Sequence, residues 1–255
     1  KYRNCFILKG GMLISAMVGI DSRATMDIDT TLRNYPLNCE SAEQIVRQIA
    51  DVEIDDKISF VIKKTEEIME DSEYQGVRLS LDAYLDKTRI PLKIDISTGD
   101  VITPCEISFS YQLMFENRTI PLLAYPPETV LAEKLETILS RGEANTRLRD
   151  FYDVYIPQRE DFVLTPDALC HALLATCRKR GHEDLLHTYA SILNEVRQSG
   201  AMRTQWMKYQ SDFDYAAGIT WDTVLDTVET LCMKTLDDHA FGDELPQEES
   251  QFEMH

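Results

Sequence analysis

Two aspartates separated by one residue are the clearest candidates for chemistry in this chain. Asp27 and Asp29 alternate with apolar residues as in a strand, so both carboxylates are predicted to lie on one face. Carboxylates this close repel each other unless a cation lies between them, and Mg²⁺ prefers carboxylate oxygens and substrate phosphates. Asp95, at the centre of another apolar segment, supplies a third acid, for which Asp82 and Asp86 compete. Transfer chemistry with two metal ions needs about this many ligands.

A glycine turn precedes the two aspartates and suits phosphate binding. Cys5–Leu8 is a short apolar run that predicts a buried strand, and Gly10 and Gly11 let the backbone turn sharply and approach a ligand closely. Met12–Val18 predicts a helix whose first N–H groups would face the phosphates. The order of strand, glycine turn, helix and acidic strand predicts a site for a triphosphate and its metal ions.

The polar residues around these motifs each have two interpretations. Lys9 either contacts phosphate or neutralises the two aspartates. Arg23 and Thr25 alternate onto the same face as Asp27, so Thr25 is expected to hydrogen-bond either a ligand or a neighbouring strand.

Two later helical segments carry further charged candidates. Lys134 lies one or two turns into a helix, where it could pair with the triphosphate and offset charge as pyrophosphate leaves. The alternative is a surface salt bridge to a residue one turn away. Asp150 and Asp153 are spaced to share one helical face, with Arg149 beside them. They either bind nucleotide or acceptor, or lock this helix to the sheet through buried ion pairs.

In their order along the chain, these motifs resemble those of the AbiEii/MenT family of nucleotidyltransferase-like toxins, within the DNA polymerase beta superfamily. The resemblance covers residues 5–156. It rests on the combination of motifs, which are Lys9-Gly10-Gly11, Arg23-x-Thr25-x-Asp27-x-Asp29, a helix with Lys134, and Arg149-Asp150-x-x-Asp153.

The resemblance implies a Mg²⁺-dependent transfer of a nucleotide from an NTP, with GTP and CTP as candidates, to an acceptor such as the acceptor end of tRNA. It also implies a toxin of a bacterial toxin–antitoxin or phage-defence (abortive infection) system, with a cognate antitoxin as a partner. Asp27, Asp29 and Asp95 would hold the metal ions, and Asp95 would also deprotonate the acceptor hydroxyl. Lys134 would be catalytic. The expected nucleotide-binding residues are Lys9, Gly10, Gly11, Arg23, Thr25, Arg149, Asp150 and Asp153.

The charge balance argues against a simple nucleic-acid-binding protein. Twenty-six Lys and Arg face 44 Asp and Glu, a net charge of −18. Residues 237–255 hold seven of these acids and no Lys or Arg, which leaves −11 for the rest. An RNA acceptor would therefore need a local basic patch, since phosphate contacts dominate such binding. The candidates are Arg141, Arg147 and Arg149, or Arg178-Lys179-Arg180; the second group is as readily a solvated helix end.

Two alternatives from other classes stay open. One is a partner protein that keeps the pocket and binds nucleotide without turnover. The other is a nucleotidyltransferase that acts on a protein or a small molecule, which the acidic body would suit better than RNA.

Other catalytic classes lack their motifs. There is no GxxxxGK[ST] phosphate loop, and the five histidines show no zinc spacing. The six cysteines form no CxxC pair and are expected to be buried thiols in a reducing cytoplasm. No apolar run approaches the roughly 20 residues of a membrane helix, so we expect a cytoplasmic protein.

The pattern predicts an α+β fold, with a nucleotidyltransferase-like mixed sheet flanked by helices and followed by a mainly helical region. We expect a catalytic domain over residues 1–157, a helical domain over 158–236 and an acidic, flexible tail over 237–255. Ser41 has capping-box spacing for a helix. Further expected strands are 58–63, 77–85, 90–97 and 118–124, and further expected helices are 41–52, 127–141, 165–180 and 221–236.

Overall fold

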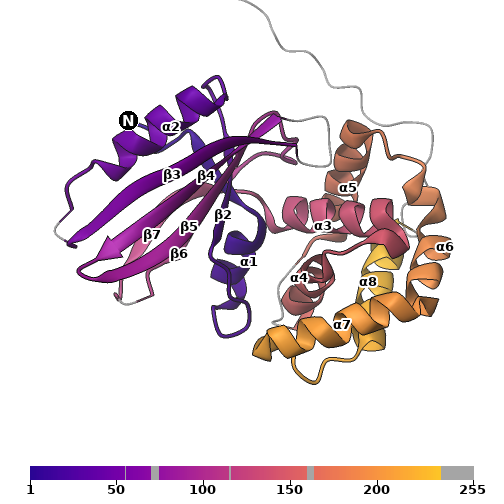
Figure 1. Cartoon of the computed structure of the whole chain (residues 1–255). Helices are drawn as coiled ribbons and strands as arrows, with labels where there is room; N and C mark the ends of the chain where they lie inside the picture. Colours follow the sequence, from indigo (N-terminus) through magenta and orange to yellow (C-terminus); the bar gives the residue numbers. More distant parts are fainter. Residues whose placement is uncertain (55, 70–74, 115, 160–163, 237–255) are drawn as a thin grey trace, which may run out of the picture.

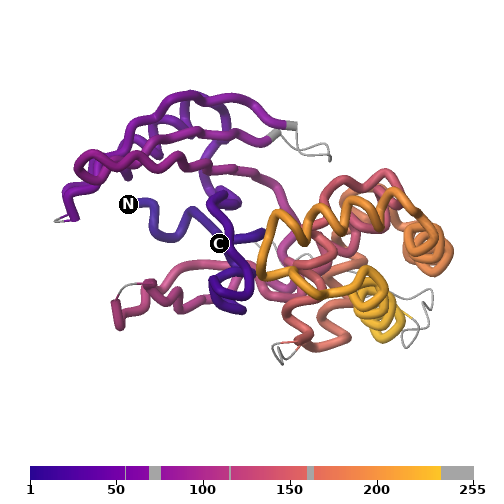
Figure 2. The backbone as a smooth tube through the Cα atoms, turned by 60° about the horizontal axis from the view of Figure 1, so that its bottom comes forward, coloured from indigo at the N-terminus to yellow at the C-terminus, as the bar shows by residue number. Residues whose placement is uncertain are grey.

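The computed structural model describes residues 1–54, 56–69, 75–114, 116–159 and 164–236. In this part of the chain, a mixed seven-stranded sheet stands beside a helical region (Figure 1 and Figure 2). The sheet order is β3-β4-β5-β2-β1-β7-β6. Its strands are β1 (Phe6–Lys9), β2 (Asp27–Leu32), β3 (Ile58–Met69), β4 (Gln75–Leu85), β5 (Thr88–Ser97), β6 (Ile107–Gln112) and β7 (Thr119–Ala124).

Eight α-helices accompany the sheet in the described ranges. They are α1 (Gly10–Val18), α2 (Cys39–Ala50), α3 (Pro127–Arg141), α4 (Leu148–Arg159), α5 (Pro166–Arg180), α6 (Leu185–Gln198), α7 (Gly200–Asp212) and α8 (Trp221–Leu236). Short 3-10 turns, Gly142–Ala144 and Asp214–Ala216, follow α3 and α7. The predicted mixed sheet with helices and a mainly helical second half is confirmed.

The strand register aligns charged residues in one row across the sheet. Lys9 of β1 lies opposite Asp29 of β2, and Asp29 lies beside Asp95 of the parallel strand β5. Arg78 of β4 is the cross-strand neighbour of Asp95, and Glu66 of β3 is that of Arg78. Paired residues point to the same side of a sheet, so this row forms one charged face.

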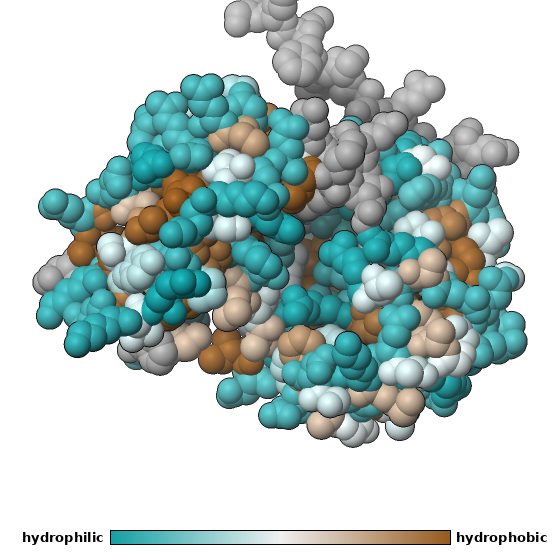
Figure 3. Space-filling model, in the orientation of Figure 1, coloured by the Kyte–Doolittle hydropathy of each residue, from teal (hydrophilic) through white to brown (hydrophobic). Residues whose placement is uncertain are grey.

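Two apolar cores pack against different parts of the sheet. On the face opposite the charged row, Ala42, Ile45 and Val46 of α2 pack against apolar residues of β2, β4 and β5. A larger core joins β1, β7 and α1 to helices α3–α8. The sheet and the helical region therefore share a continuous core. On the face shown in Figure 3, hydrophobic residues appear over the sheet among mostly hydrophilic surroundings.

Most elements agree with the prediction, with three corrections. Strand β6 was not predicted, although its residues alternate between half-buried and exposed. Helix α2 begins at Cys39 and not at Ser41, because Asn38 is the N-cap and Ser41 occupies the third helical position of the capping box. Strand β2 begins only at Asp27, so Arg23 and Thr25 precede it.

The division predicted between residues 157 and 158 falls within α4 and stays a prediction. The acidic segment 237–255 lies outside the described residues. Among the helices that the structure describes, none is long and apolar enough to cross a membrane.

The cap of α2 gives a test of the local fold. The Asn38 side chain accepts a hydrogen bond from the Ser41 backbone N–H at 2.8 Å, so Asn38→Ala should lower the free energy of unfolding by about 1 kcal/mol. Urea denaturation followed by circular dichroism measures this difference. Asn38→Asp keeps the acceptor and should remain close to the wild type; equal stability of all three proteins would contradict the cap.

Candidate active site

The three predicted acids open into one pocket. Asp27, Asp29 and Asp95 line a cavity of about 540 Å³, here called the carboxylate pocket, between β2, β5 and the helices α4 and α7. The side chain of Asp27 is 44% exposed, and that of Asp95 is 14% exposed. The alternation predicted for β2 therefore places both of its carboxylates in the same space.

Asp95 is engaged by an arginine that the sequence did not single out. Arg78 donates from Nε and Nη2 to the two Asp95 oxygens at 2.7 and 2.6 Å, and the hydrogen bonds raise the Arg78 pKa. The rival acids lie elsewhere: Asp82 pairs with Arg89 at 3.3 Å, and Asp86 occupies the β4–β5 turn with a φ of 51°. Asp95 is thus the third acid of the pocket, but its charge is already compensated.

The glycine turn brings the backbone against Asp29. Gly10 has a φ of +62°, and a Cβ there would collide with the Asp29 carboxylate. The Gly11 N–H donates to Asp29 Oδ2 at 3.2 Å, and a Cβ at Gly11 would collide with the Arg23 guanidinium. Both glycines are therefore required by close approach to side chains of the protein, and their predicted approach to a phosphate stays a prediction.

The surroundings of Asp29 shift the pKa of its carboxyl upward. Burial raises the Asp29 pKa, and the nearby Asp95 charge acts in the same direction. The positive charges of Lys134 and Lys9 and the Gly11 N–H oppose this rise. A cation at the carboxylates would stabilise the ionised form, because it removes the unfavourable interaction between buried like charges.

Lys9 forms an ion pair with Asp100, and its positive charge also acts on Asp29, lowering the pKa of that carboxyl. Lys9 Nζ lies 2.7 Å from Asp100 Oδ2, and the same oxygen accepts hydrogen bonds from Thr31, Ser97 and Tyr125 at 2.5 to 2.7 Å. Burial disfavours the Asp100 carboxylate, but Lys9 and the hydroxyl donors outweigh it and lower the pKa to about 2. Asp100 lies three residues after the end of β5, and no motif in the sequence marked it.

A buried ion cluster connects the segment before β2 to the helical region. Arg23 donates to Asp153 at 2.7 Å, and both side chains are essentially inaccessible. Lys134 of α3 bridges Asp150 at 2.5 Å and Asp153 at 3.2 Å, both on α4. Lys134 is therefore not in the surface salt bridge considered as an alternative. Described residues donate no hydrogen bond to Asp150 Oδ2, which faces Arg147 at 3.3 Å.

The cluster keeps its charges despite burial. Desolvation opposes the charged form of Lys134, but Asp150 and Asp153 outweigh it and raise the Lys134 pKa. Desolvation also opposes the Asp153 carboxylate, but Lys134 and Arg23 outweigh it and lower its pKa. The structure thus favours the locking role for Asp153, while Arg23, Lys134 and Asp150 take part in the cluster and also line the carboxylate pocket.

Helix α7 and the residues after it form the far wall of the carboxylate pocket. Phe213 lies under the Arg149 guanidinium, whose carbon is 5.5 Å from the ring centroid, and Arg149 approaches Asp27 at 4.0 Å. Tyr209 also lines this wall. Thr25 Oγ1 accepts a hydrogen bond from the Asp27 backbone N–H at 3.4 Å. The described partner of this hydroxyl therefore lies two residues further along the same segment and not on a neighbouring strand. No sequence pattern had indicated a role for this α7 wall.

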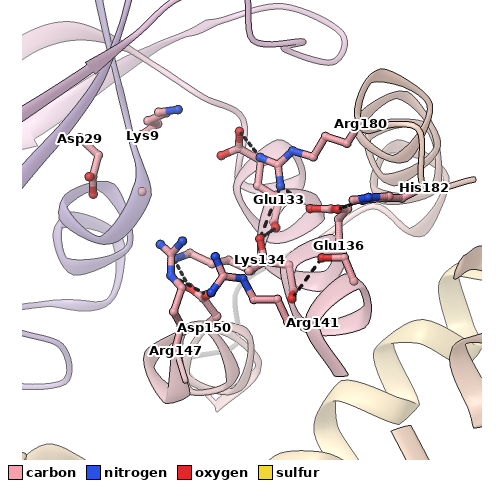
Figure 4. Close-up of a pocket in the computed structure, with 13 residues that line it drawn as sticks. Lys9, Asp29, Glu133, Lys134, Glu136, Arg141, Arg147, Asp150, Arg180 and His182 are labelled. Carbon is pink, nitrogen blue, oxygen red and sulfur yellow. Dashed lines mark hydrogen bonds and ion pairs between the residues drawn. The ribbon is translucent and has the colours of Figure 1, made fainter. Parts of the chain in front are cut away.

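A second, smaller cavity adjoins the first. It has a volume of about 120 Å³, is here called the arginine pocket, and includes Arg141, Arg147 and Arg180 in its lining. Figure 4 shows Lys9 and Asp29 on the sheet side of this space and the arginines on the helical side. In the first predicted basic group, Arg141 lines the arginine pocket, Arg149 lines the carboxylate pocket and Arg147 lines both. In the second group, Arg180 lines the arginine pocket, whereas Arg178 lies outside both cavities and pairs with Glu183 at 3.0 Å.

The donor set fits a magnesium ion in part. Asp27 and Asp29 supply two carboxylates in one pocket, whereas both Asp95 oxygens are held by Arg78. Among the described residues, no three His, Cys, Asp or Glu side chains already form a metal-binding cluster. An ion held by Asp27 and Asp29 would therefore complete its shell with substrate and water oxygens.

The cysteines are free, but not all are buried. Cys5, Cys170, Cys177 and Cys232 are buried as predicted. Cys105 is exposed and Cys39 is half-buried, which corrects that prediction.

Comparison with known proteins identifies relatives. Residues 1–227 match the family model described as "Nucleotidyl transferase AbiEii toxin, Type IV TA system". No curated protein matches the chain. Two similar crystal structures, both from Helicobacter pylori, are a protein described as a candidate nucleotidyltransferase and the protein JHP933. Each is 14% identical with a TM-score of 0.46 over 92% of this chain, and the match covers 90% and 87% of those chains.

The Asp100 cluster predicts an acid-sensitive contribution to stability. A lowered folded-state pKa stabilises the protein above the ordinary carboxyl pKa, by about 2 kcal/mol here, and the effect is lost as pH falls toward 2. The stability difference between wild type and Asp100→Asn should therefore shrink by about 1 kcal/mol from pH 5 to pH 3. Urea denaturation at both pH values tests this, and a constant difference would show that Asp100 is not held ionised by Lys9.

The buried ion cluster predicts a large effect of one neutral substitution. Asp153→Asn leaves Arg23 and Lys134 without their shared counter-charge and should cost about 3–5 kcal/mol of unfolding free energy. Arg147→Gln removes a half-exposed partner of Asp150 and should cost less than about 1 kcal/mol. Similar losses for the two variants in urea denaturation would mean that the cluster does not hold the regions together.

Proposed function

Because the chain belongs to the AbiEii family of nucleotidyltransferase toxins, we propose that it transfers a nucleotide from an NTP to an acceptor hydroxyl through Asp27, Asp29 and Asp95. The gathering of these three carboxylates in one pocket, beside the glycine turn, carries this proposal. The family is described as toxins of type IV toxin–antitoxin systems, so a cognate antitoxin is the expected partner.

Asp27 and Asp29 are proposed to hold Mg²⁺. When bound, the ion would neutralise the donor phosphates and favour attack at the α-phosphorus. Asp29 is positioned for this by the Gly11 N–H, and the more exposed Asp27 can reach the donor from the open side of the pocket.

Asp95 is proposed to accept the proton of the acceptor hydroxyl. The hydroxyl oxygen forms the new bond to the α-phosphorus, the bond to the β-phosphate bridging oxygen breaks, and pyrophosphate leaves with that electron pair. Asp95 lies beside Asp29 in the sheet, and although Arg78 donates to both of its oxygens, each oxygen keeps a second lone pair that can accept the proton.

The far wall of the carboxylate pocket suits the nucleoside. Phe213 and Tyr209 offer aromatic surface, and Arg149 adds a planar cation above Phe213. Bases stack on such side chains with little dependence on base identity. The proposed donors GTP and CTP would both fit this kind of wall.

The acceptor is proposed to be the acceptor end of tRNA. Arg147, Arg149 and Lys208 provide local positive charge at the carboxylate pocket, although residues 1–236 carry −11 overall. Phosphate contacts of this kind weaken with salt, so binding of an RNA acceptor should fall steeply as ionic strength rises. The acidic body also favours the second candidate, transfer to a protein or a small molecule.

The test uses the purified protein with each α-labelled NTP, Mg²⁺ and total cellular RNA. Wild type should place label on RNA, and the Asp27→Asn/Asp29→Asn variant should lose about 1,000-fold or more of this activity, because the substitution removes both proposed metal ligands. Asp21→Asn is the matched control, since Asp21 is exposed and lines neither pocket.

The other outcomes each decide against part of the proposal. Label on protein or on a small molecule would exclude RNA as the acceptor. NTP bound with Mg²⁺ but never turned over would identify a binding protein. Full transfer by the double variant, with its fold verified by circular dichroism, would refute the carboxylate mechanism.

A further inference from the structure

The third acid of the carboxylate pocket differs from its neighbour on β2 in what holds it. Arg78 donates from Nε and Nη2 to the two oxygens of Asp95 at 2.7 and 2.6 Å. Two parallel bonds of this kind are among the strong contacts between a guanidinium and a carboxylate. Asp29, beside Asp95 in the sheet, instead accepts a hydrogen bond from the Gly11 backbone N–H. The Asp95 carboxylate therefore already has a cation of its own in the pocket.

The sheet fixes Arg78 in this position. Arg78 on β4 is the cross-strand neighbour of Asp95 on β5, and Glu66 on β3 lies opposite Arg78 on its other side. The hydrogen bonds to Asp95 raise the pKa of Arg78, and although burial opposes this rise, the charges of Asp27 and Glu66 add to it. The side chain lines the carboxylate pocket. Arg78 is thus a permanent positive charge on the sheet side of the site.

A divalent ion at Asp95 would compete with this arginine. It would bind an oxygen that Arg78 already contacts, and two cations at one carboxylate repel each other. Among the described residues, no three His, Cys, Asp or Glu side chains come together as a metal-binding cluster, which agrees with this exclusion. Asp27 is much less engaged, because its described ion pair is with Arg149 at 4.0 Å. The acids of β2 are therefore better placed for an ion than Asp95.

The acids of the pocket nevertheless need positive charge at Asp95. The negative charge of Asp95 raises the pKa of Asp29, so these two carboxylates disfavour each other's ionised form. In a site with two metal ions, the second ion offsets such charge. Arg78 supplies the same compensation without a metal, and its planar guanidinium holds the Asp95 carboxylate in one orientation.

We propose that Arg78 replaces a second divalent ion, so that the carboxylate pocket holds a single Mg²⁺, between Asp27 and Asp29. This inference rests on the proposed function and makes Arg78 a positioning residue. It keeps Asp95 out of the metal shell and leaves the remaining lone pairs of that carboxylate to the acceptor hydroxyl. Asp95 then accepts a proton and coordinates no metal.

The first experiment counts metal ions by electron paramagnetic resonance, with Mn²⁺ as the probe because it takes the same oxygen ligands as Mg²⁺. With one equivalent of a non-hydrolysable NTP analogue, wild type should bind one Mn²⁺ per chain. Arg78→Met frees both Asp95 oxygens and should bind two, about 3.5–4 Å apart, which gives a spin-coupled spectrum. Arg78→Lys keeps the charge and should bind one. Arg89→Met is the matched control, since Arg89 pairs with Asp82 at 3.3 Å and lines neither pocket.

A second experiment uses a charge-matched variant, in case Arg78→Met does not fold. Arg78→Gln/Asp95→Asn removes one positive and one negative charge, so the net charge of the pocket is unchanged. Its Mn²⁺ affinity without nucleotide should stay within about 3-fold of wild type, whereas Asp29→Asn should weaken binding about 10-fold or more, because it removes a proposed ligand. Circular dichroism verifies the fold of each variant.

Contradicting results are distinct from a failure of the proposed function. A spin-coupled Mn²⁺ pair in the wild type, with transfer intact, would overturn the role of Arg78 alone. A single ion in folded Arg78→Met, or a charge-matched variant that loses as much affinity as Asp29→Asn, would also overturn it. The expected Mn²⁺ counts in a wild type that transfers from no NTP would support the single-ion site and refute the proposed transfer.

Discussion

The ion cluster of Arg23, Asp153, Lys134 and Asp150 is the constraint on which the site depends. Charges so deeply buried are tolerated only when they are paired, so the segment before β2, helix α3 and helix α4 must dock in one arrangement. Arg23 also lies against the backbone of Gly11, where any side chain would displace it. The same contacts thus fix the glycine turn, the start of the acidic strand and the helical wall opposite them. Stability and the geometry of the pockets have a common source.

This arrangement produces two cavities with different chemistry around a shared boundary. Lys134, Arg147 and Asp150 belong to both linings, the acidic strands open to one side, and the arginines gather on the other. The Arg78–Asp95 pair adds a second feature, because it compensates the charge of the third carboxylate in the pocket.

Local sequence patterns predicted the parts of this site that depend on local structure. Alternation placed Asp27 and Asp29 on one face, and the apolar segment around Asp95 predicted β5. Arg78, Asp100 and Phe213 were not predicted, because their roles arise from strand register and from packing of α7, which no local pattern encodes. Strand β6 was missed because half-exposed alternation next to turn residues is a weak signal. Lys9 was expected near acids, but the acid that it pairs with follows from how the chain turns after β5.

The most direct test of the account is a crystal structure of the protein with Mn²⁺ and a non-hydrolysable NTP analogue. The account predicts an anomalous manganese peak between Asp27 and Asp29 and the nucleoside against Phe213. A manganese ion or a nucleotide bound away from the two aspartates would contradict it.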